Sequence, residues 1–65
     1  MLIRSSERFR AAVAETISVA ADEGLLTPQQ ESTLYGCNHS GDSTGALLGL
    51  ARLIRRYGAE KEEEA

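Results

Sequence analysis

Six arginines are the side chains in this sequence with the clearest capacity to bind a ligand. They fall into two groups, near the start and near the end of the chain: Arg4, Arg8 and Arg10, then Arg52, Arg55 and Arg56. Guanidinium groups form paired hydrogen bonds with phosphates and carboxylates. If the helices that carry the two groups run antiparallel, all six side chains gather at one end of the molecule. That end would bind an anion: a nucleotide, a cyclic nucleotide, a nucleic acid or an acidic patch on a protein.

The first group of arginines lies at the start of a predicted helix, where positive charge opposes the helix dipole. A binding function would explain why the sequence places positive charge there in spite of the unfavourable interaction with the helix dipole. Two alternatives need no ligand. The side chains lie in solvent over the core, or Glu7 and the acidic segment 60–64 neutralise them. Both acidic partners are close in the sequence, so these alternatives stay open.

The segment from Gly36 to Ser43 has two glycines five positions apart, the spacing of a phosphate-binding loop before a helix. Asp42 stands where that motif has a lysine, and a carboxylate at this position would repel phosphate. We therefore predict no nucleotide hydrolysis here and interpret Asp42 or Ser43 as the cap of the next helix. A weaker anion contact with the free N–H groups of that helix remains an alternative.

Cys37 and His39 are the residue types of a nucleophile and its general base. They lie two positions apart in the same predicted loop, with no evident third group to orient the histidine. One cysteine and one histidine also cannot complete a structural zinc site within one chain, although an oligomer could share one. We predict no catalytic residue, no metal and no cofactor, so the chain is not expected to be an enzyme.

Two tyrosines and one leucine are candidates for a protein interface. Tyr35 and Tyr57 combine a large ring with a polar tip, which suits interfaces. Leu48 lies off the apolar stripe of its helix. Both tyrosines also belong to stripes that face the predicted core, so a purely structural role is the alternative.

The apolar periodicity predicts an all-α fold with three helices, over about residues 6–23, 28–35 and 43–57. The two longer helices are expected to pack antiparallel, joined through the short one. About seven residues separate the second and third helices, whereas a DNA-binding helix-turn-helix has a turn of about three to four. Specific readout of duplex DNA is therefore not expected.

Local signals define the ends of these helices. Ser5 or Ser6 can cap the first helix, and Thr27-Pro28-Gln29-Gln30 is a capping-box start for the second. The predicted ends are at Gly24, Gly36 and Gly58, because glycine commonly occupies the position just after a helix.

The chain has 65 residues and a net charge of −3, which fits a single helical domain over residues 1–59 followed by an acidic disordered tail over 60–65. Residues 1–59 carry six arginines and six acidic residues, so the tail holds the whole net charge. A domain this small usually needs a disulfide, a metal or a partner chain for stability. With a single cysteine, a second chain is the remaining choice, and we predict a homodimer or higher homo-oligomer.

The expected function is therefore non-enzymatic. We predict a small interaction protein that binds a protein partner, such as a regulator, an inhibitor or an adaptor, including the kind that phages encode. A binder of a phosphate-bearing ligand is the alternative. The free cysteine and the absence of an apolar leader segment indicate a cytoplasmic protein. The longest apolar patch, residues 46–51, is too short to span a membrane.

Overall fold

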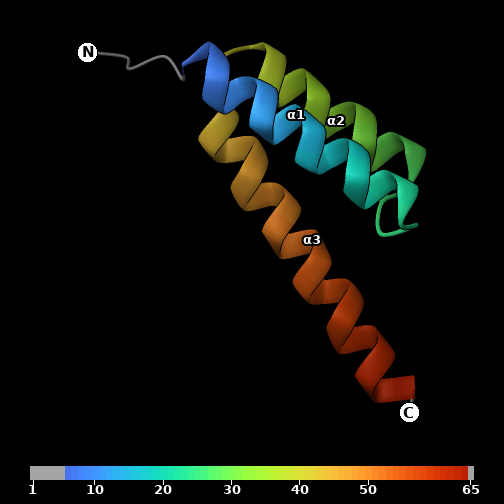
Figure 1. Cartoon of the computed structure of the whole chain (residues 1–65). Helices are drawn as coiled ribbons and strands as arrows, with labels where there is room; N and C mark the ends of the chain where they lie inside the picture. The colour runs from blue at the N-terminus through green and yellow to red at the C-terminus, as the bar shows by residue number, and fades with distance from the viewer. Residues whose placement is uncertain (1–5, 65) are drawn as a thin grey trace.

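The computed structural model describes residues 6–64 of the chain, and for residues 61–64 it describes the backbone alone. These residues form three α-helices, α1 (Glu7–Asp22), α2 (Pro28–His39) and α3 (Ser43–Glu64), and no strand within the described range (Figure 1). The prediction of an all-α, three-helix fold is confirmed. Among the described residues, no helix combines the length and apolar character that a membrane span requires. Arg4 lies outside this range.

α1 begins and ends within one residue of its predicted bounds. The Ser6 hydroxyl accepts a hydrogen bond from the Phe9 N–H at 3.1 Å, which satisfies one of the unpaired donors of the first turn. At the other end, the Glu23 N–H reaches back to carbonyls of the last turn, and Gly24 follows with φ +76°. The glycine is required there because other residues rarely adopt positive φ.

α2 begins as predicted and ends one turn later than predicted. The Gln30 N–H donates to the Thr27 hydroxyl at 3.1 Å, and the Thr27 N–H donates to the Gln30 side-chain oxygen at 2.9 Å, completing the capping box. The helix then continues through Gly36 to His39, so the predicted end at Gly36 is wrong. Gly41, with φ +106°, makes the turn instead. The helix has 12 residues and is therefore about 18 Å long.

α3 begins at the predicted residue and continues past its predicted end. The Asp42 carboxylate accepts a hydrogen bond from the Gly45 N–H at 2.9 Å, as predicted for a helix cap. The helix passes through Gly58, which does not have positive φ, and runs to Glu64. The predicted end at Gly58 is wrong, and the backbone of residues 60–64 is helical where a disordered tail was expected. Ala65 lies outside the described residues.

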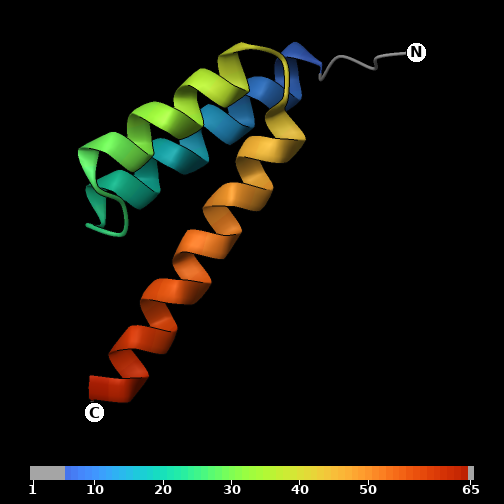
Figure 2. The ribbon, with the colours of Figure 1, turned by 180° about the vertical axis from the view of Figure 1, so that it is seen from behind.

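α1 and α2 lie side by side and antiparallel, and α3 starts at the same end as α1 and then diverges from it (Figures 1 and 2). A hydrogen bond of 3.0 Å from the Asn38 side-chain amide to the Arg10 carbonyl joins the end of α2 to the start of α1. The direction of α3 differs from the expected antiparallel packing of the first and third helices. The reason is the length of α2, which runs along α1 and returns the chain to its starting end.

The core lies where the three helices meet, and six apolar residues of the described part of the chain are buried in it: Val13, Ile17, Ala20, Leu34, Ala46 and Leu50. Gly49 allows α3 to approach α2 closely, since a Cβ at this position would lie 3.2 Å from a methyl carbon of Leu34. α3 packs more closely on α2 than on α1. The side of the molecule between α1 and the diverging α3 is therefore the least covered.

Candidate functional site

The structure does not bring the predicted arginines together. Arg8 and Arg10 lie at the start of α1, whereas Arg52, Arg55 and Arg56 lie near the middle of α3. Because α1 and α3 start at the same end, the two groups are separated along the molecule (Figure 1). Four of the five are exposed and Arg10 is half-buried. The described part of the chain therefore provides no single arginine-rich end for a phosphate.

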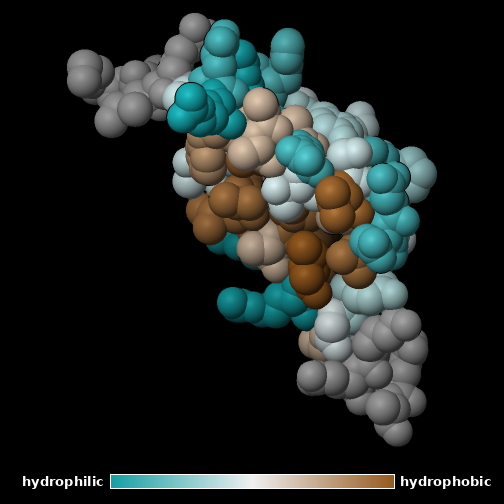
Figure 3. All heavy atoms as spheres, viewed as in Figure 1, coloured by the Kyte–Doolittle hydropathy of each residue, from teal (hydrophilic) through white to brown (hydrophobic). Residues whose placement is uncertain are grey.

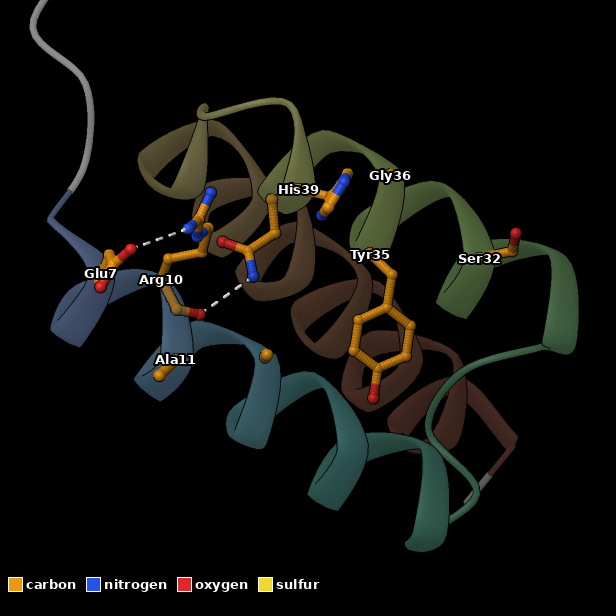
Figure 4. Close-up of a pocket in the computed structure, with 9 residues that line it drawn as sticks. Glu7, Arg10, Ala11, Ser32, Tyr35, Gly36 and His39 are labelled. Atoms are coloured by element: carbon orange, nitrogen blue, oxygen red, sulfur yellow. Dashed lines mark hydrogen bonds and ion pairs between the residues drawn. The ribbon is translucent and has the colours of Figure 1, made fainter.

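A shallow hollow between α1 and α2 contains the best-placed of these arginines (Figure 4). Arg10 forms an ion pair with Glu7 at 3.9 Å, and Glu7 is almost fully exposed, so the pair holds the guanidinium weakly. The Tyr35 ring reaches from α2 toward α1 over the same hollow. The Asn38 side chain at the edge of the hollow is buried, and its amide donates the hydrogen bond to the Arg10 carbonyl that joins α2 to α1. One weakly held cation beside a carboxylate does not make an anion site.

The predicted glycine loop is mostly helix. Residues 36–39 form the last turn of α2, and only residues 40–42 connect α2 to α3. Asp42 caps α3, and a Cβ at Gly45 would collide with its carboxylate, which accounts for the glycine. The phosphate-loop interpretation that the sequence argued against finds no support in this geometry.

Cys37 is held as a thiol. Its Sγ lies 3.5 Å from the Asp42 carbonyl oxygen and 3.8 Å from the Asp42 carboxylate, and it donates toward both. Burial raises the pKa of this thiol, and the negative charge of Asp42 and the hydrogen bond raise the pKa further. A nucleophilic cysteine needs the opposite shift. His39 is exposed at the end of α2, and no cluster of three metal-ligating side chains occurs within the described part of the chain.

The three residues predicted for an interface lie on different parts of the surface. Tyr35 is half-buried over the hollow between α1 and α2. Tyr57 lies at the opposite end, beside the α1–α2 turn with Leu25 and Arg56. Leu48 is 56% exposed on α3. These residues do not form one surface.

A different set of apolar residues does share a surface, which we call the α1–α3 face: Phe9 and Val19 on α1, and Leu47 and Ile54 on α3. Hydrophobic side chains gather across α1 and α3 in the view of Figure 3, with hydrophilic side chains on both sides. The helical periodicity places these residues on the flanks of the two helices that turn toward each other, next to the buried Val13 and Leu50.

The α1–α3 face is large for so small a chain. The exposed fractions are 36% for Phe9, 54% for Val19, 37% for Leu47 and 39% for Ile54. Taking about 200 Å² for a fully exposed large side chain, the four together leave on the order of 300 Å² of apolar surface in water. The helical spacing of the sequence places Phe9, Leu47 and Ile54 on the apolar stripes of α1 and α3, where burial is expected. They are exposed because α3 diverges from α1.

Charged side chains lie on the solvent side of both helices beside the α1–α3 face. Arg8, Glu15 and Asp22 follow one another on α1 at intervals of seven residues, so they share one flank of the helix. On α3, Arg55 lies about 90° and Arg52 about 150° around the helix from Leu47 and Ile54. All five side chains are exposed, and none forms an ion pair within the part of the chain that the structure describes.

Comparison with known proteins gives no relative for this chain: no family model matches it, and neither does any curated protein or solved structure. Its function must be argued from the site itself.

Proposed function

We propose that this chain is a non-catalytic interaction protein that binds a protein partner through the α1–α3 face. The observation that carries the proposal is the exposure of Phe9, Val19, Leu47 and Ile54 on one side of the molecule. The largest apolar patch on a small protein is often functional, and contact with another protein is one of its common uses. A regulator, an inhibitor or an adaptor would use such a surface.

The size of the α1–α3 face favours reversible binding. Covering on the order of 300 Å² of apolar surface stabilises a complex by about 8 kcal/mol from this side alone, at 25 cal/mol per Å². A partner that covers a similar area contributes a similar amount. Association costs roughly 4–15 kcal/mol in lost freedom of motion. The balance supports complexes of moderate affinity, which suits a regulatory contact.

Other observations favour this function over the alternatives. The separation of Arg10 from Arg56 argues against a binder of nucleotides or nucleic acid. The raised pKa of the Cys37 thiol argues against covalent catalysis. A single free thiol is also consistent with a reducing compartment, and we propose the cytoplasm.

Affinity purification with matched bait variants tests the proposal. Leu47→Glu together with Ile54→Glu places two charges on the α1–α3 face, and Gln29→Glu adds one to the exposed start of α2 as the control. We expect the original chain and the control to retain the same protein, which mass spectrometry identifies. An untagged copy of the chain itself counts as such a protein. The face variant should lose that protein while its circular dichroism stays helical. Equal retention by all three baits would contradict the proposal.

A further inference from the structure

We infer that the outer face of α3, formed by Leu48, Arg52, Arg55 and Arg56, binds an acidic protein segment that carries an apolar side chain among its carboxylates. This face lies on the side of α3 that points away from the core, so it is separate from the α1–α3 face. The inference therefore goes beyond the proposed function and gives the chain a second contact surface, which an adaptor needs.

The residues of the outer face share one side of α3 because of their spacing. Arg52 and Arg55 follow Leu48 by four and seven positions, and Arg56 follows Arg52 by four. The four side chains lie about 120–160° around the helix from the buried Leu50. All four are exposed, Leu48 to 56%. The face extends over about 12 Å along the helix axis, a length that a short segment of a partner can cover.

The three arginines carry positive charge that no ion pair balances within the described residues. Arg52 and Arg56 are one turn apart, where two like charges repel each other and weaken the helix. α2 offers no compensation, because Gln30 and Thr33, which line its groove with α3, are uncharged. Carboxylates of a partner would remove the repulsion and form charge-assisted hydrogen bonds with the guanidinium groups.

The acidic end of the chain leaves most of this charge uncompensated. The backbone of residues 60–64 continues α3, so it leads away from Arg52 and does not fold back over it. Glu60 is one turn from Arg56 but eight residues, or about 12 Å of helix, from Arg52. The carboxylates that Arg52 and the neighbouring Leu48 lack must come from a partner.

The surroundings of the arginines select a protein over a nucleic acid or a membrane. Nucleic acids and anionic membranes present negative charge over long distances, so either one lying along α3 would also meet Glu60 and the acidic residues that follow it. A protein segment can confine its carboxylates to the outer face. Leu48 also requires an apolar side chain to cover it, which a phosphate backbone does not supply.

Titration with short synthetic peptides, followed by amide NMR shifts, tests the inference. Two peptides of equal length and charge are compared, one of Glu-Glu-Ser repeats and one of Glu-Glu-Leu repeats. We expect both to shift the signals of Leu48, Arg52 and Arg55, and the leucine peptide to bind more tightly. Arg52→Gln with Arg55→Gln should raise both dissociation constants about two- to thirtyfold, since each exposed ion pair contributes a factor of about 1.4–5.

The matched control removes the same charge from the start of α1. Arg8→Gln with Arg10→Gln should change the dissociation constants by less than a factor of about two, because these arginines lie on another part of the surface. Equal weakening by the two double variants would show a response to net charge alone and would overturn the inference. The absence of saturable peptide binding would overturn it as well.

The apolar part of the face is tested with Leu48→Gln, which should bind the two peptides equally. Leu47→Gln changes the α1–α3 face and should keep the preference for the leucine peptide. Circular dichroism should stay helical for both variants. If Leu47→Gln alone removed the preference, the acidic segment would bind the α1–α3 face, so this inference would fail while the proposed function would stand.

Duplex DNA and vesicles that contain phosphatidylserine complete the comparison. We expect both to bind the chain more weakly than the leucine peptide at the same salt concentration. Tighter binding of either one, weakened by Arg52→Gln with Arg55→Gln, would assign the outer face of α3 to a phosphate-bearing surface and would refute a protein partner there.

Discussion

Gly36 offers a direct test of where α2 ends. The sequence places the end of the helix at this glycine, which would give it the left-handed conformation common just after a helix. In the structure Gly36 lies inside α2, and among the described glycines only Gly24 and Gly41 have positive φ. The two conformations predict opposite effects of Gly36→Ala on the free energy of unfolding.

The size of the effect follows from the surroundings of Gly36. A Cβ added there would meet no neighbouring heavy atom within 4 Å, so the substitution causes no collision. Alanine inside a helix is favoured over glycine by about 0.5–1 kcal/mol, because the unfolded chain has less backbone freedom to lose. We expect Gly36→Ala to raise the free energy of unfolding by that amount. The corresponding rise in Tm is roughly 2–8 °C for a domain of this size.

Urea unfolding followed by far-ultraviolet circular dichroism, at one fixed protein concentration, measures this change. Gly24→Ala is the matched control, because a Cβ at Gly24 also meets nothing within 4 Å but the backbone there has φ +76°. The control should lower the free energy of unfolding by about 1–2 kcal/mol, because alanine is strained in the left-handed conformation. A similar loss at Gly36 would show that α2 ends at this residue and would refute the reasoning.

Three further predictions concern the capping box, the core and the thiol. Thr27→Ala removes the oxygen that accepts a hydrogen bond from the Gln30 N–H at 3.1 Å, and urea titration should show a free energy of unfolding lower by about 1 kcal/mol. An unchanged free energy of unfolding would contradict the role of the capping box. Ile17 has no exposed surface, so Ile17→Ala should cost about 2–5 kcal/mol in the same assay, and a cost below 1 kcal/mol would show that the core is not packed as described. Iodoacetamide should modify Cys37 more slowly in the folded chain than in urea, and Asp42→Asn should speed the reaction by lowering the pKa of the thiol; equal rates would argue against the raised pKa. Since the folded state favours the protonated thiol, its contribution to stability is full below the unfolded pKa and is lost as pH rises through the folded pKa.

The starts of the helices could be predicted from the sequence because they depend on contacts between residues three positions apart. Ser6, Thr27 with Gln30, and Asp42 each form the predicted cap with a backbone N–H in the following turn. The ends were harder to predict. Gly24 ends a helix, whereas Gly36 and Gly58 do not, since a glycine permits left-handed backbone without requiring it.

The buried residues could be predicted only in part. Val13, Ile17 and Leu50 lie in the core as their spacing indicates, because a stripe on one side of a helix must pack against something. Leu47 and Ile54 belong to the same apolar side of α3 and remain partly exposed. Periodicity identifies which residues share a side of a helix, but the crossing of two helices decides how much of that side is covered.

The arrangement of charges was decided by the tertiary structure alone. The sequence shows two groups of arginines and a set of acidic residues, and it leaves open whether the two groups meet. One additional turn in α2 makes that helix long enough to return the chain to the start of α1, so Arg10 and Arg56 end up apart. From there α3 diverges from α1, which leaves the α1–α3 face open. Local contacts between neighbouring residues thus determined where each helix begins, whereas the direction in which α3 leaves the hairpin determined which surface is available for binding.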